Sequence, residues 1–187
     1  ENVRFSMTIG DKHIIDIVRT NPESGFRLLL TKYKKPIYWH IRRIVVGHDD
    51  AQDAAQETFV RVFRNFSSCK SGDKLRGWIF RIATNEALRM LDKRKSTTLS
   101  LDDEATNIAG QTIADPYFDN SDKAAVMLQK AILSLPTKQQ LTFNLRYYDE
   151  MTYDDIAEVI GSTASAAKMN YHIAKDKIVK FINSNDL

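Results

Sequence analysis

The sequence holds few of the residues from which an enzyme builds an active site. It has one cysteine, Cys69, and four histidines scattered along 187 residues. We find no phosphate-binding glycine loop, no nucleophile paired with a base, and no ligand spacing typical of a metal site. The sequence therefore predicts a protein that acts by binding, with no catalytic residue, no metal and no cofactor.

The most informative pattern runs over residues 152–175. It predicts a short helix over 153–160 that Thr152 caps, a turn that starts at Gly161, and a second helix from Ala164. This order is typical of a helix-turn-helix, whose second helix enters the DNA major groove. The spacing also suits any three-helix bundle with a glycine turn, so both interpretations stay open. The side chains expected to face outward from the second helix are Ser165, Lys168, Met169, His172 and Lys175.

Residues 49–65 predict a helix with two sharply different faces. The acidic face carries Asp50, Asp53 and Glu57. It either complements the helix dipole or docks on a basic partner. The apolar face is expected to hold Ala55, Phe59, Val62, Phe63 and Phe66.

Residues 75–95 predict a helix in which aromatic and cationic side chains alternate. Trp78 and Phe80 lie among Arg76, Arg81 and Arg89, and the segment ends in three consecutive cations at 93–95. This mixture suits single-stranded DNA, which binds by base stacking and phosphate contact. Alternatively, the aromatic side chains are core and the cations only keep the surface soluble.

A polar loop over 67–73 precedes this helix and contains Cys69. For this cysteine, a redox role and a role as a plain small residue are both open.

The elements that position these residues are predicted to be helical throughout. Only 7 Gly and 4 Pro occur, which disfavours an all-β fold with its many tight turns. We expect Pro36 to kink the helix that starts at Pro22, and Gly47 to end it in the left-handed conformation. No apolar run reaches the ~18 residues of a membrane span, and no signal-peptide pattern occurs, so we expect a cytoplasmic protein without membrane insertion. Helices are predicted over 11–19, 22–46, 49–65, 75–95, 123–135, 137–148, 153–160 and 164–183.

The formal charge of +3 is unevenly distributed along the chain. Residues 1–95 carry 19 Lys and Arg against 11 Asp and Glu, residues 96–125 carry one against six, and residues 126–187 carry seven against seven. This asymmetry predicts two domains, 7–95 and 123–187, joined by a flexible acidic linker over 96–122. Together with the helical periodicity, it predicts an all-α protein of two helical domains.

Three ordered motifs resemble those of the bacterial sigma factors. Residues 49–61 (DDAQDAAQETFVR) resemble the signature of sigma region 2, and residues 78–85 (WIFRIATN) are similar to the motif that follows it. Residues 131–175 resemble region 4. Two such domains with only a linker between them are similar to the extracytoplasmic-function (ECF) group.

This resemblance implies partners and a role for each face. Region 2 would bind the β′ clamp of core RNA polymerase and melt the minus-ten promoter element, while region 4 would read the minus-thirty-five element and meet the β flap. An anti-sigma factor is a further partner by resemblance. The core-binding residues would be Asp50, Asp53, Gln56 and Glu57. The minus-ten residues would be Phe66, Lys70, Lys74, Arg76, Trp78, Arg81 and Asn85. The minus-thirty-five residues would be Thr163, Ser165, Lys168, Met169, Asn170, His172 and Lys175.

The function implied is that of a sigma factor that directs promoter recognition, DNA melting and transcription initiation. The alternative is a regulator that uses only the helix-turn-helix and binds an operator without polymerase. Such regulators usually dimerise to read two half-sites, and we see no obvious dimerisation helix in the sequence.

Overall fold

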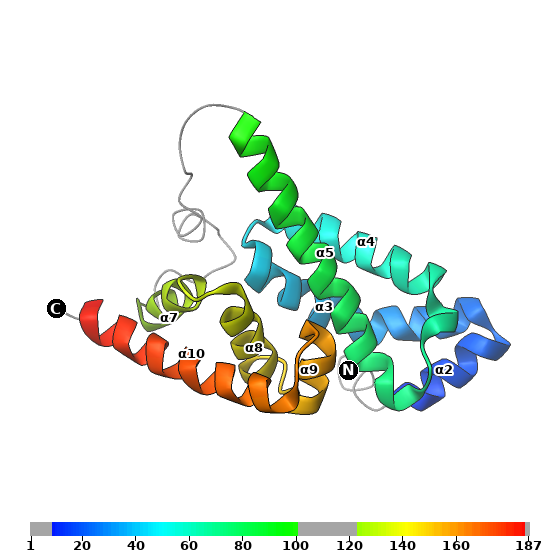
Figure 1. Ribbon diagram of the computed structural model, residues 1–187. Helices are drawn as coiled ribbons and strands as arrows, with labels where there is room; N and C mark the ends of the chain where they lie inside the picture. Colours follow the sequence, from blue (N-terminus) through cyan, green and yellow to red (C-terminus); the bar gives the residue numbers. More distant parts are fainter. Residues whose placement is uncertain (1–8, 101–122, 186–187) are drawn as a thin grey trace. The chain divides into compact units, whose positions relative to one another are not determined.

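The computed structural model describes residues 9–100 and 123–185, and all regular structure within these ranges is helical (Figure 1). The chain divides into two compact units. The first comprises Glu1–Val45 and Asp49–Leu91, and the second comprises Val46–His48 and Asp92–Leu187. The all-α, two-unit architecture predicted from the sequence is therefore confirmed. Most of the predicted linker, 101–122, lies outside the described residues.

The first unit begins with two helices that cross closely. Asn21 separates them, and its Oδ1 accepts a hydrogen bond from the Ser24 amide at 3.2 Å, while Pro22 occupies the first helical position as predicted. Gly25 makes the close crossing possible, because a Cβ there would lie 2.5 Å from the Val18 backbone. In order, the unit contains α2 (Asp11–Thr20), α3 (Pro22–Val45), α4 (His48–Arg64) from Asp49, the 3-10 turn η1 (Phe66–Ser68) and α5 (Gly72–Ser100) as far as Leu91.

A polar cluster joins α2 to α3. The Tyr33 hydroxyl donates to Asp11 Oδ2 and Lys32 Nζ donates to Asp11 Oδ1, both at 2.7 Å. Burial raises the pKa of the Tyr33 hydroxyl, and its hydrogen bond to Asp11 raises it further. The phenol therefore stays protonated and keeps donating.

The end of α3 differs from the prediction. The helix runs through Pro36 without interruption and ends at Val45, so the residue directly after it is Val46. Because the left-handed residue of a helix C-terminus is the first one beyond the helix, it falls on Val46 (φ 67°), and the prediction for Gly47 was wrong.

The buried face of α4 is also rotated from the predicted one. Its buried residues are Ala51, Ala54, Thr58 and Val62, whereas Phe63 is 61% exposed. Thr58 is accommodated inside because its hydroxyl donates to the Ala54 carbonyl oxygen at 2.7 Å, which satisfies the polar group within the helix.

Helix α5 is longer than predicted at both ends. It starts at Gly72, where the prediction placed a loop, and Asp73 in its first turn complements the helix dipole. It continues to Ser100, five residues into the predicted linker. Its buried side chains include Leu75, Ile79, Phe80, Ala83 and Ala87.

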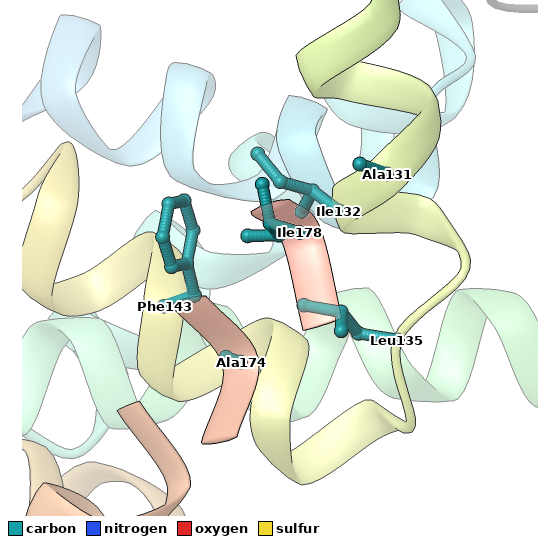
Figure 2. Packing of buried hydrophobic residues seen from close by; sticks show 6 residues of the cluster. All are labelled: Ala131, Ile132, Leu135, Phe143, Ala174 and Ile178. Atoms are coloured by element: carbon teal, nitrogen blue, oxygen red, sulfur yellow. The ribbon is translucent and has the colours of Figure 1, made fainter. Parts of the chain in front are cut away.

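The second unit agrees more closely with the sequence. Its helices are α7 (Lys123–Leu133), α8 (Thr137–Tyr147), α9 (Tyr153–Ile160) and α10 (Ala164–Asn185), each within two residues of its predicted ends. Three helices share one core, and Figure 2 shows its members converging: Ala131, Ile132, Leu135, Phe143, Ala174 and Ile178.

Within the described ranges, no helix combines the length and apolar character needed to cross a membrane.

Candidate nucleic-acid interfaces

The helix-turn-helix of the second unit is held by three local devices. The Thr152 hydroxyl accepts from the Asp155 amide at 3.2 Å and donates to Asp155 Oδ2 at 2.7 Å, which caps α9 as predicted. Gly161 ends α9 in the left-handed conformation (φ 65°, ψ 53°). Thr163 then caps α10, since its hydroxyl accepts from the Ala166 amide at 3.1 Å. The start of α10 is thereby fixed relative to α9.

The first turns of α10 expose the side chains that the sequence predicted. Thr163, Ser165, Lys168, His172 and Lys175 are exposed, Met169 is 61% exposed, and Asn170 is half-buried. The opposite side of the helix packs inward through Ala167 and Ala174, both fully buried. A helix N-terminus that carries small polar groups and lysines is suited to approach the phosphates and base edges of a duplex.

In the first unit, the predicted minus-ten residues lie on η1, the loop before α5, and α5 itself. Phe66 and Trp78 are half-buried and meet edge to face, with ring centroids 6.1 Å apart. The Arg76 guanidinium lies 5.5 Å from the centre of the Phe80 ring. The remaining predicted members are exposed: Lys70, Lys74, Arg76, Arg81 and Asn85.

Cys69 lies in this loop but faces the interior. It is 6% exposed, and its thiol lies 3.7 Å from the Ser71 carbonyl oxygen. Burial raises the pKa of the thiol. Because the thiolate is the reactive form, these surroundings favour the plain structural role over the redox role.

The predicted acidic face of α4 is divided between exposed and engaged residues. Asp53 and Gln56 are exposed, while Asp50 and Glu57 are half-buried. Glu57 Oε1 lies 3.0 Å from Arg61 Nε on the next turn, so part of its charge is balanced within the helix.

Arg61 continues this ion-pair network from α4 to α5. Its Nε lies 2.7 Å from Glu86 Oε1, and Arg89 Nη1 donates to the same oxygen at 2.7 Å. The Arg61 contacts are ion pairs by distance, and its Nε–H is aligned with neither oxygen for a hydrogen bond. Glu86 is 7% exposed, and its carboxylate ties the acidic helix to the basic one.

Two groups in the first unit were missed by the sequence interpretation. Phe63 was assigned to the core although it is exposed, and Glu86 was not singled out. Steps of three and four residues from Ala51 pass through Ala54, Thr58 and Val62 and leave Phe63 outside the buried stripe. Finding this stripe in the sequence requires a threonine to be accepted as a core residue. Among the described residues, no group of three or more His, Cys, Asp or Glu is arranged to hold a metal ion.

Each of the two units contains a segment that matches a known protein family. The sigma-70 region 2 family matches residues 29–97, and the sigma-70 region 4 family matches residues 125–178. The ECF RNA polymerase sigma factor SigW of Bacillus subtilis (strain 168) is 28% identical over 178 residues, which span 90% of this chain and 95% of SigW.

Two solved structures share the fold. The structure of CnrH in complex with the cytosolic domain of CnrY gives a TM-score of 0.70 at 17% identity, and the match covers 94% of this chain and 98% of that one. The sigma factor RpoE of Bartonella quintana, in complex with the anti-sigma factor NepR, gives a TM-score of 0.69 at 20% identity, covering 86% and 98%.

Both sigma-70 domains are thus present, in the order region 2 and then region 4. The chain belongs to the sigma-70 family and, within it, to the ECF group. It is a factor that directs transcription initiation.

Proposed function

We propose that this chain binds core RNA polymerase through α4 and contacts promoter DNA through α5 and α10, and that it acts in the cytoplasm by binding alone. The observation that carries this proposal is the division of charge along the α4–α5 segment. Residues 48–60 hold four Asp and Glu and no Lys or Arg, whereas residues 61–95 hold ten Lys and Arg against three Asp and Glu. One surface therefore suits a basic protein partner and the other suits a polyanion.

The polymerase contact would be made by the exposed side of the first turns of α4. Asp50, Asp53, Gln56 and Glu57 follow one another at steps of three, three and one, which keeps them on neighbouring parts of one helical surface. A basic surface on the polymerase, the β′ clamp in this proposal, would meet them. Charged groups at such a rim chiefly set the partner and the rate of association.

The minus-ten contact would join stacking with phosphate neutralisation. Phe66 and Trp78 would receive unpaired bases, and the surrounding cations would follow the backbone of the melted strand. Taking a base out of its duplex costs a few kcal/mol, roughly what a small number of stacking contacts returns. The residues concerned are Phe66, Lys70, Lys74, Arg76, Trp78, Arg81 and Asn85.

The minus-thirty-five contact would be made by α10 in the major groove. Its first two turns carry hydroxyls, an amide and a single lysine but no arginine, so reading of bases would be modest and polymerase would have to hold the domain in place. The residues concerned are Thr163, Ser165, Lys168, Met169, Asn170, His172 and Lys175. In this proposal the domains span 7–95 and 123–187, and the second also meets the β flap or an anti-sigma factor.

Selection of duplex DNA from a randomised pool separates this proposal from a stand-alone regulator. The pool is offered to the chain alone and to the chain bound to core polymerase. We expect two separated sequence elements to be enriched only when both proteins are present. Enrichment of an operator-like site by the chain alone, unchanged when polymerase is added, would favour the regulator instead.

A further inference from the structure

Four aromatic rings form a continuous row across the first unit. Ring centroids lie 4.6 Å apart for Phe63 and Phe26, 5.2 Å for Phe26 and Phe66, and 6.1 Å for Phe66 and Trp78. The rings come from α4, α3, η1 and α5, so the row is built by the tertiary fold and not by one sequence motif. We call these four residues the aromatic row.

The far end of the aromatic row is the most exposed. Phe63 has 61% of its surface in solvent, while Phe26 and Phe66 beneath it are half-buried. The Phe63 and Phe26 rings are inclined by 51°, so they are not stacked face to face. A large aromatic surface is thus left available on a rigid support, which is what a stacking ligand requires.

The surroundings of Phe63 favour a polyanionic ligand. Arg64, the next residue, is exposed, and so are Lys70 in the loop that follows and Lys74 in the first turn of α5. Arg27 is also exposed, with its guanidinium paired to Glu23 at 2.8 Å. The aromatic row also begins at Trp78 and Phe66, the two rings already assigned to unpaired DNA, so its other end continues that surface.

We infer that Phe63, supported by Phe26, is an additional stacking position for an unpaired base of the melted promoter strand. The inference rests on the proposed function and extends it beyond the Phe66–Trp78 end. Phe26 precedes the region 2 match, which begins at residue 29. The melted strand would then follow the row from α5 across η1 to the C-terminal end of α4, with a base against Phe63 and a phosphate near Arg64.

The test compares two oligonucleotides of equal charge on the complex of the full chain with core RNA polymerase. One is a fluorescently labelled single-stranded DNA of randomised sequence, and the other is an abasic strand of the same length. The dissociation constant of the abasic strand divided by that of the base-containing strand reports base contacts separately from phosphate contacts. We expect Phe63→Leu, which keeps an apolar side chain but removes the aromatic face, to reduce this ratio roughly tenfold.

Two further variants make the outcome specific. Val179→Ala changes an apolar residue of similar exposure, 54%, in the other unit and should leave the ratio unchanged. Phe63→Ala distinguishes stacking from general apolar docking. If Phe63→Leu binds both strands like the wild type, the inference is wrong, and loss of binding in Phe63→Ala alone would point to an apolar protein partner.

Failure of the inference and failure of the proposed function give different results. Co-elution of the wild-type chain with core polymerase is measured first, and its absence would contradict the proposed function. Co-elution together with a preference for the base-containing strand that Phe63→Leu leaves unchanged would overturn only the inference. Equal affinity of the wild type for the two strands would also contradict the stacking proposed for Phe66 and Trp78. Unchanged circular dichroism of each variant confirms that a lost ratio reflects a lost contact.

Discussion

Asp53 and Glu57 lie one turn apart on α4 but offer different charges to a partner. Glu57 is paired with Arg61 at 3.0 Å, and 45% of its side chain is exposed, while Asp53 is exposed. An exposed i,i+4 ion pair contributes about 0.3–0.5 kcal/mol, so it is easily exchanged for a contact with another protein. Glu57 must still give up this pair, however, and Asp53 is the more exposed of the two, so at the residue scale Asp53 is the stronger candidate for the polymerase contact.

Reversing the charge at Asp53 tests this assignment. We expect Asp53→Lys to lower the affinity for core polymerase by roughly tenfold or more, because a favourable contact becomes a repulsive one. The measurement is titration of labelled chain with core polymerase, followed by fluorescence anisotropy. Asp16→Lys, a reversal at another exposed acidic residue of the same unit, is the matched control. Equal weakening by both variants would mean that net charge matters and the α4 face does not.

The Cys69 thiol should react slowly in the folded protein. Its burial raises its pKa, so the folded state holds less thiolate at pH 8 than the unfolded chain does. We expect labelling by a thiol-specific disulfide reagent to be at least about tenfold slower in the native protein than in denaturant. Similar rates in the two states would show an accessible thiol and would reopen the redox interpretation.

At the scale of elements, the contact of α4 with α5 depends on a buried carboxylate. Glu86 is 7% exposed and meets Arg61 and Arg89, whose side chains are 39% and 59% exposed. Because the two arginines remain partly hydrated, the network contributes less than a fully buried one. It nevertheless links α4 to α5, the two helices proposed to contact polymerase and DNA.

Removing the charge of Glu86 should weaken that contact. We expect Glu86→Gln to reduce the free energy of unfolding of the first unit by about 1–2 kcal/mol, since two guanidinium groups lose their common partner. Urea unfolding followed by circular dichroism measures the change. Arg89→Gln removes only the more exposed partner and should cost under about 0.5 kcal/mol. A cost for Glu86→Gln no larger than that of Arg89→Gln would contradict the bridging role.

Substitution by alanine is expected to have opposite effects on stability at two glycines. Gly161 has a φ of 65°, which an alanine adopts only with strain, so Gly161→Ala should destabilise the second unit by about 1 kcal/mol. Gly77 lies inside α5 with no atom within 4 Å of an added Cβ, so Gly77→Ala should stabilise the first unit by up to about 1 kcal/mol. Thermal denaturation of both variants measures the two signs. Equal shifts would contradict the left-handed assignment of Gly161.

At the scale of the whole molecule, the sequence predicted helices better than surfaces. The helix-turn-helix was predictable because its signals are local: Thr152 caps, Gly161 terminates and Thr163 caps again. The aromatic row was not, because Phe63 and Phe26 meet through tertiary packing, and a buried Thr58 replaces the expected apolar residue. No short-range pattern reports which side of an amphipathic helix its neighbours cover.

The ends of α5 escaped prediction for a related reason. The segments 72–74 and 96–100 are mostly polar, and a segment without regularly spaced apolar residues shows no helical period in the sequence. The acidic residues that follow, Asp102, Asp103 and Glu104, lie outside the described residues.

Promoter-dependent transcription tests most directly whether the chain works as a sigma factor. Run-off transcription from the templates enriched in the selection experiment is measured with core polymerase, with the chain, and with both. We predict a transcript of defined start only when both are present, and its loss with Asp53→Lys but not with Asp16→Lys. A transcript that appears without the chain, or tight duplex binding by the chain with no transcript in any combination, would contradict the central claim.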